Sequence, residues 1–379
     1  MSKSKIYKFI AVALLLIFLG GVAIYTTRSN RHQAIIKTTI AHKLGLVDNK
    51  WNVDQASGEY QMLSPTFVID GIYKSMEGPK SSDYVRISAN SDLVYLTGFH
   101  VKAYDAKTMA RVSNDYICHT NVDFNDVNYY SHFGLEDRIG KQYPRMTSLS
   151  HGLEDFIFPT GYGVPMRGSD LLYVTTQSLN HNHKNPNLHV KHKVSIEYTT
   201  KPLKPLLSRT AFIMLPYDKY DPYKSPIDPG TDFCIPVETD NHSYDDGTGG
   251  KLSGHWVIPP GKNIYRSDVG NQLQITDSLR LHAAAIHVHP FATSISLMDK
   301  TTKTSIFTSD IENHNDRVGL KKVGQFLSEN GIWLFKDRQY ELVLTVDNTS
   351  NEDQDMMGSA FLFFYDDELE QNINKKSGD

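Results

Sequence analysis

Short runs of β-branched and aromatic residues recur along this 379-residue chain and constrain its fold more than any other feature. Beyond Trp51 these runs alternate with segments that contain Gly, Pro, Asn and Asp. The clearest runs cover residues 85–88, 94–103, 171–176, 193–198 and 211–216. This alternation is typical of a β-sandwich. Neither a long amphipathic helical pattern nor a short internal repeat follows residue 33, so the sequence predicts an all-β fold.

The segment Lys-Pro-Leu-Lys-Pro at residues 201–205 divides the β-rich part into two halves. We therefore predict two tandem antiparallel β-sandwich domains, jelly-roll-like, over residues 51–200 and 201–366. Residues 216–254 are rich in Pro, Gly, Asp and Tyr and are predicted to form a surface insertion in the second domain. Residues 34–50 are a polar connector that could begin as a helix, and residues 367–379 are predicted to be a frayed polar tail.

An apolar run from Phe9 to Tyr25 dominates the N-terminus, with lysines before it and arginines after it. As a helix this run is about 26 Å long, the short end of a membrane crossing. We predict that residues 1–33 form a transmembrane signal anchor that leaves the main body periplasmic or extracellular. A cleaved signal peptide is the alternative.

The composition of the chain excludes one class of binding partner and one class of fold. The formal net charge of −4 argues against a nucleic-acid partner. With only two cysteines, the chain is not a disulfide-rich scaffold. Cys118 and Cys234 either form one disulfide outside the cytoplasm or remain two buried thiols.

Two histidines lie in the apolar run at residues 283–291, which Pro290 helps to close. The run predicts a buried strand. Because side chains two positions apart on a strand share a face, His287 and His289 should point the same way. Such a pair of imidazoles can ligate copper, zinc, iron or nickel. The alternative is a pair of hydrogen-bonded core residues.

A methionine pair, Met356 and Met357, precedes a second apolar run at residues 358–365. We expect a thioether there to face the two imidazoles across a sandwich. Two imidazoles with a methionine sulfur select copper, especially Cu(I), over zinc. The alternative is that both methionines only fill gaps in the core.

Six further histidines fall into three groups. His255 is predicted to orient a ligand imidazole without binding the metal itself. His282 has odd spacing from His287, so it should face away as a hydrogen-bonding or surface residue. A further four lie among Asn, Lys and Pro, and we predict a solvated loop for them; they are His181, His183, His189 and His192.

The second half resembles the copper type II, ascorbate-dependent monooxygenases, the group of peptidylglycine α-hydroxylating and dopamine β-monooxygenases. The resemblance is carried by residues 257–262, 287–289 and 348–365, and more faintly by residues 115–119, 158–163 and 171–180. In all it spans about residues 50–366. It implies two β-sandwich domains with one copper each. His287, His289 and Met357 would hold the copper at which oxygen is activated.

The first-domain copper of this family is held by three histidines, and only His119 stands in a matching place. Cys118 occupies the position of its neighbour, and the third position falls near Gln177. We predict Cys118 and His119 as a weaker second metal site, although adjacent residues on a strand point to opposite faces. We therefore expect the electron-transfer site to be degraded or rebuilt and the chain to hold one copper.

The predicted function is that of a membrane-anchored, extracytoplasmic copper-binding protein resembling these monooxygenases. It would hydroxylate a small organic or peptide substrate with oxygen and an external electron donor. Two alternatives stay open: a non-catalytic copper storage or delivery protein on the same scaffold, and an interaction module that has lost its metal.

Overall fold

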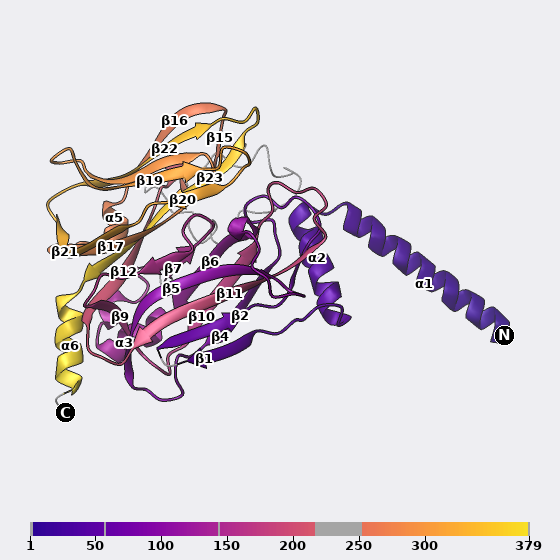
Figure 1. Cartoon of the computed structure of the whole chain (residues 1–379), viewed down its shortest axis with the longest axis horizontal. Helices are drawn as coiled ribbons and strands as arrows, with labels where there is room; N and C mark the ends of the chain where they lie inside the picture. The colour runs from indigo at the N-terminus through magenta and orange to yellow at the C-terminus, as the bar shows by residue number, and fades with distance from the viewer. Residues whose placement is uncertain (1–2, 57, 143–144, 217–251, 378–379) are drawn as a thin grey trace.

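One continuous sheet of twelve strands runs through both halves of the chain (Figure 1). It belongs to a computed structural model that describes residues 3–56, 58–142, 145–216 and 252–377. The main path of the sheet follows β1 (Asn52–Ala56), β2 (Glu59–Leu63), β11 (Leu188–Thr199), β5 (Leu93–Asp105), β9 (Tyr162–Arg167), β12 (Lys204–Phe212), β23 (Gln354–Tyr365), β17 (Ser278–Val288) and β21 (Phe326–Phe335). The halves meet where β9 and β12 pair in parallel.

Three short strands extend this sheet at its margins. They are β3 (Phe67–Ile69) beside β11, β8 (Asp155–Ile157) beside β5 and β15 (His255–Ile258) beside β23. Residues 217–251, most of the predicted insertion, lie outside the described residues, and Cys234 with its predicted bridge to Cys118 lies there too.

The first half is a sandwich, as the sequence predicts. Its second layer is a sheet of β4 (Lys80–Val85), β10 (Leu172–Ser178), β6 (Ile117–Phe124) and β7 (Arg145–Leu149). The layers meet where His192 on β11 hydrogen-bonds Thr176 on β10. The short helix α3 (Asp126–Phe133) adds buried aromatic residues to the core. Two 3₁₀ turns flank these strands, η1 (Asn114–Tyr116) and η2 (Glu136–Arg138).

The second half is also a sandwich. Its outer layer is the sheet of β16 (Gly261–Asp268), β22 (Tyr340–Asn348), β18 (Ala292–Asp299), β19 (Thr304–Asn313) and β20 (Leu320–Val323). Strand β22 alternates buried and half-buried residues with the period of two that a one-sided strand requires. The smaller elements of this half are β13 (Leu215–Pro216), β14 (Leu252–Ser253) and α5 (Gly270–Leu273).

Strands β17 and β23 are apolar without alternation because both of their faces are buried. They confirm the buried strands predicted over 283–291 and 358–365. From β23, Phe363 reaches the first half, with its ring centroid 4.6 Å from that of Phe158 and 5.5 Å from that of Phe156. The two sandwiches therefore share one hydrophobic core, with β7 of the first half packed against β17 and β23 of the second.

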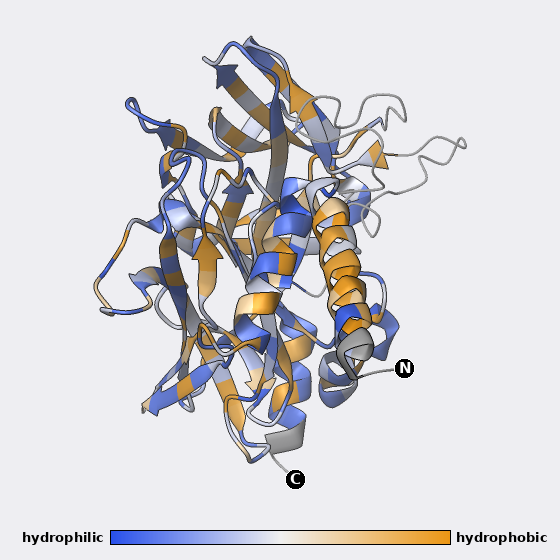
Figure 2. Ribbon diagram, turned by 90° about the vertical axis from the view of Figure 1, so that its right-hand side faces the viewer, coloured by the Kyte–Doolittle hydropathy of each residue, from blue (hydrophilic) through white to orange (hydrophobic). Residues whose placement is uncertain are grey.

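Helix α1 (Lys3–Thr26) extends away from the body (Figure 1). Within it, Tyr7–Thr26 has the length and hydropathy of a membrane span, and none of that span is buried in the protein. Figure 2 shows that apolar residues make up most of this helix. This helix is consistent with membrane association.

Helix α2 (Asn30–Lys43) confirms the helical start expected for the connector. Ser29 caps it by accepting a hydrogen bond from the backbone N–H of His32. The helix docks on the first sandwich, where Ala34 is fully buried and Lys37 forms a 2.6 Å ion pair with Asp70. The link between α1 and the sandwich is therefore a packed element.

The prediction of a frayed tail is wrong, because residues 367–377 form helix α6 (Asp367–Ser377). Leu369 and Ile373, four positions apart, lie on one face of the helix and are buried against the body. Arg138 of the first half forms ion pairs of 2.5 Å with Asp366 and 2.6 Å with Glu368. The C-terminal segment thus joins the two halves.

Candidate functional site

Strand β17 delivers His287 and His289 to the interior between the halves. His287 lies near the end of the strand, opposite Ser359 of β23, and His289 follows its last residue. The two rings are 5.7 Å apart between centroids and perpendicular, and their residues are 5% and 3% exposed. The prediction of two buried, neighbouring imidazoles is confirmed.

Met357 lies on β23, the strand next to β17 in the same sheet. The ladder between the two strands ends where Val288 is opposite Gly358, so His289 and Met357 are the residues next to this last pair. The expectation that Met357 would face the imidazoles across a sandwich is wrong: Met357 lies on the neighbouring strand of the same sheet and lines one cavity with His287. The physical reason is that both apolar runs are central strands and pair with each other.

His255 adds a third imidazole to this row. It lies on β15, directly opposite Met357, with its ring centroid 5.9 Å from that of His289. It is 3% exposed. This position suits the predicted role of orienting a ligand imidazole, which stays a prediction.

Asp355 fixes the orientation of His289. The Nδ1–H of His289 donates to the Asp355 carboxylate at 2.9 Å. Burial by itself would raise the pKa of Asp355, but the adjacent His289 outweighs this effect and lowers that pKa. A neutral ring that donates from Nδ1 carries its lone pair on Nε2, and the buried Nε2 of His289 has no hydrogen-bond partner among the described residues.

His287 is held in its neutral form. Burial lowers its pKa well below the usual value, and the neighbouring rings of His289, His119 and His255 lower it further. Its Nδ1 atom is buried and has no hydrogen-bond partner in the described part of the chain. His287 and His289 therefore each hold one buried nitrogen available to a ligand.

The first half contributes His119 to the same place. His119 is buried on β6, and its ring stands edge-on to that of His287 at 6.1 Å between centroids. His119, His287 and Met357 line a cavity of about 10 Å³, room for about one water molecule. We call His119, His255, His287 and His289, together with Met357, the histidine cluster.

Cys118 does not join this cluster. It is the extra residue of a β-bulge between Ile117 and His119, and it packs against Met76 and Leu179. Gln177 lies opposite His119, where its side-chain amide donates to the carbonyls of Met76 and Gly78 at 2.9 and 2.7 Å. The structure thus brings His119 toward the second-half site, while Cys118 contacts Met76, which lines the same cavity.

The other histidines show where local sequence misleads. The solvated loop predicted for His192 is wrong: this residue is fully buried on β11, and burial lowers its pKa to about 3. His181 lies in a loop, as predicted, but it is half-buried, and burial lowers its pKa to about 3. His282 lies at a β-bulge, where its ring meets the carbonyl of Ser328 at 2.9 Å, which confirms a hydrogen-bonding role away from the cluster.

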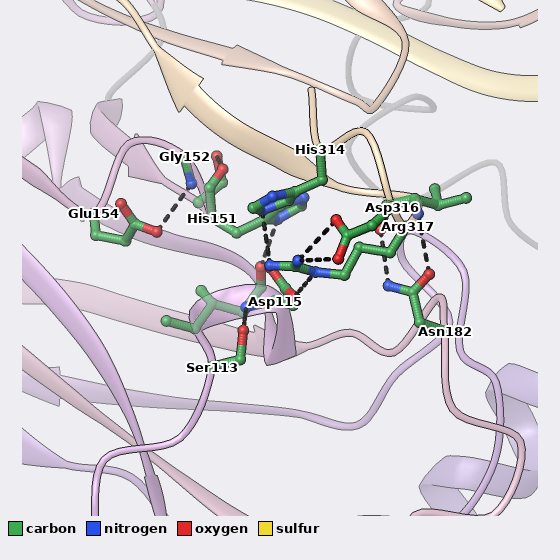
Figure 3. Close-up of polar contacts among 12 residues, drawn as sticks. Ser113, Asp115, His151, Gly152, Glu154, Asn182, His314, Asp316 and Arg317 are labelled. Atoms are coloured by element: carbon green, nitrogen blue, oxygen red, sulfur yellow. Dashed lines mark hydrogen bonds and ion pairs between the residues drawn. The ribbon is translucent and has the colours of Figure 1, made fainter. Parts of the chain in front are cut away.

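A second polar contact joins the halves beside the cluster (Figure 3). Arg317 of the second half donates to Asp115 of the first at 2.7 Å and to the ring of His314 at 3.0 Å. His151 reaches the same region, where its Nδ1 lies 3.0 Å from the carbonyl of Ile117 and burial lowers its pKa to about 4. Sequence reasoning did not single out this contact, because its members come from three separate loops.

Among the described residues, no three His, Cys, Asp or Glu side chains are arranged to enclose a metal ion. A metal at the histidine cluster would therefore depend on the thioether of Met357 as well as on imidazoles. Such a ligand set is soft and matches copper better than zinc.

No family model matches this sequence, and no curated protein matches it. Solved structures match over most of the chain at low similarity. A recombinant peptide:N-glycanase F is 10% identical with a TM-score of 0.36, over 81% of this chain and 96% of its own. The cowpea mosaic virus top component is 10% identical with a TM-score of 0.31, over 79% and 90%.

A third example is the major capsid protein P2 of bacteriophage PM2, at 11% identity and a TM-score of 0.31, over 80% of this chain and 97% of its own. At these TM-scores the likeness carries no weight for function. None of the three is described as a copper monooxygenase, so the resemblance to that family remains a prediction.

Proposed function

We propose that this chain binds one copper ion through His287, His289 and Met357. The observation that carries the proposal is the pair of buried imidazole nitrogens, Nδ1 of His287 and Nε2 of His289, that no described residue satisfies. A buried polar atom without a partner costs about 1–3 kcal/mol. A metal ion bound between these nitrogens would remove that cost.

The chemistry of the ligand set favours copper in its reduced state. Two imidazoles and a thioether are soft ligands, which suit Cu(I). The lowered pKa of His287 keeps its ring neutral, so that one ring nitrogen carries the lone pair that a ligand needs. Asp355 supports His289 in the way that a carboxylate supports a metal-bound imidazole. Bound copper would supply one-electron redox chemistry.

The surroundings favour binding over hydroxylation. The cavity beside His287 measures about 10 Å³, whereas pockets for small organic substrates usually measure about 300–1,000 Å³. Gln177, where the resembling family has a histidine, is occupied in bonds to the backbone. A copper storage or delivery role is therefore the version that we propose.

The N-terminal helix supports a membrane location for this activity. Lys3, Lys5 and Lys8 precede the apolar run from Phe9 to Tyr25, and by the positive-inside tendency they favour an N-terminus on the cytoplasmic side. We propose that the two sandwiches lie outside the cytoplasm, tethered by α1.

The test is the copper content of the full-length chain purified in detergent and loaded with Cu(I) under ascorbate. We expect one copper per chain, lost in His287→Ala and in His289→Ala. Met357→Leu conserves volume and should weaken Cu(I) much more than Zn(II). His282→Gln, away from the cluster, is the matched control and should keep the copper. Stoichiometric copper that survives both alanine substitutions would refute the assignment, as would a wild-type chain that binds none.

A further inference from the structure

A polar groove lies on the large sheet of the first half, over β2, β11 and β5, which are neighbours in the sheet (Figure 1). Its volume is about 300 Å³, at the lower end of the usual range for ligand pockets. Every side chain that lines it is polar or charged. We call it the lysine groove, after Lys102 and Lys193.

The strand register arranges the side chains of this groove in rows. Lys193 of β11 lies directly opposite Lys102 of β5. Two positions along, Ser195 lies between Gln61 and His100. Two further on, Glu197 lies opposite Glu59. One end of the groove is therefore cationic and the other is anionic, about 13 Å apart along β11.

The lysine pair is unusual because like charges directly opposite each other destabilise a sheet. Within the described residues, neither Lys102 nor Lys193 has an ion pair or a side-chain hydrogen bond. Lys191, two positions before Lys193 on the same strand, shows the contrast: it pairs with Asp48 at 2.5 Å. An anion placed between the two ammonium groups would relieve their repulsion.

The opposite end offers acceptors. His100 has a carboxylate at each ring nitrogen, Asp155 at 2.7 Å and Glu197 at 3.0 Å. A hydrogen bond from Gln61 is the main cause that lowers the pKa of Glu59, and Ser195, Lys193 and His100 lower it further, so this carboxyl stays ionised. Ionised carboxylates only accept hydrogen bonds, so this end suits groups that donate them, such as sugar hydroxyls.

From this arrangement we infer that the lysine groove binds a hydroxylated carboxylate, an acidic sugar of one or two rings. The sugar carboxylate lies between Lys102 and Lys193, and its hydroxyls donate to Glu59 and Glu197. The site is independent of copper, since the histidine cluster lies between the halves and the groove lies on the first half alone.

Calorimetric titration of the full-length chain in detergent tests the inference, with glucuronate as the probe. Glucuronate should bind more tightly than acetate, which lacks the hydroxyls, and than glucose, which lacks the charge. Lys102→Ala and Lys193→Ala should each weaken glucuronate about tenfold, as expected for loss of one charged contact. Lys193→Arg should retain most of the affinity.

Two further variants complete the design. Glu59→Gln should weaken glucuronate but leave acetate unchanged, and Lys322→Ala, on exposed β20, should change neither. The inference is overturned if glucuronate binds no better than acetate, or if the double substitution of Lys102 and Lys193 leaves the affinity unchanged. Tighter binding of glycerol 3-phosphate than of glucuronate would also overturn it, in favour of a phospholipid headgroup.

Discussion

The histidine cluster and the lysine groove are both rich in titratable side chains, yet they hold them in opposite ways. In the cluster, His287 and His289 are almost wholly buried, and each leaves a ring nitrogen without a described partner. In the groove, both ring nitrogens of His100 meet carboxylates, and the space is about thirty times larger. The comparison teaches that the buried imidazoles of the cluster need a bound ligand or must stay uncharged, whereas the open groove can hold charged side chains.

Acid should destabilise the chain through buried histidines that lie outside the lysine groove, and this is the largest expected effect. His151 and His192 have pKa values lowered by burial to about 4 and about 3, from an ordinary 6.5. Below pH 6.5 the unfolded chain takes up protons at these positions and the folded chain does not. The free energy of unfolding should therefore decrease as the pH is lowered below 6.5, by about 1.4 kcal/mol per pH unit for each group. This decrease continues until the pH reaches the pKa of that group in the folded chain.

Thermal denaturation of the chain between pH 7 and pH 4 measures this loss. His192→Gln should reduce the slope, because it removes one buried titrating ring. Ser195→Ala, in the groove, removes no titrating group and should leave the slope as it is. A melting temperature that stays constant from pH 6.5 to pH 4.5 would contradict the picture of buried neutral imidazoles.

Copper should stabilise the folded chain through the histidine cluster, and a substitution in the lysine groove should not change this stabilisation. A ligand present at a hundred times its dissociation constant stabilises the folded state by about 2.7 kcal/mol. We expect Cu(I) under ascorbate to raise the melting temperature of the wild-type chain and of the Lys102→Ala variant equally. His287→Ala should abolish the rise. An equal rise in His287→Ala would place the copper elsewhere.

Asp355 offers a finer test of the cluster. Because its carboxylate orients His289, Asp355→Asn should lower copper affinity by about 10- to 100-fold, the usual effect of losing such a partner. Competition with a chelator of known affinity measures the change, and Glu59→Gln in the groove is the control. Unchanged copper affinity would mean that Asp355 serves the fold alone.

Sequence patterns predicted which residues form the cluster better than they predicted how those residues are arranged. Apolar runs with a histidine pair predicted a buried strand and two imidazoles on one face, and the structure confirms both. The pattern could not tell which strand pairs with which, so Met357 was expected across the sandwich and lies beside His289 in the same sheet. Pairing of central strands is a tertiary choice that burial patterns leave open.

Two errors had signals in the sequence. His192 shares its parity with Val190, Val194 and Ile196, all buried on β11, and this period of two could have predicted its burial. Leu369 and Ile373 are four positions apart, the spacing of one helix face, within a segment interpreted as a frayed tail. In both cases polar neighbours hid a short periodic pattern.

The lysine groove should respond least to substitution, and in the opposite direction to the cluster. Lys193→Ala removes one of two like charges that face each other across neighbouring strands, so it should stabilise the fold by a few tenths of a kcal/mol. Chemical denaturation at low ionic strength measures this gain, and added salt should reduce it because salt screens exposed charges. The matched substitution Lys191→Ala breaks the ion pair with Asp48 and should destabilise instead. If Lys193→Ala also destabilises, the two lysines already share a stabilising partner, and the case for an anion between them is lost.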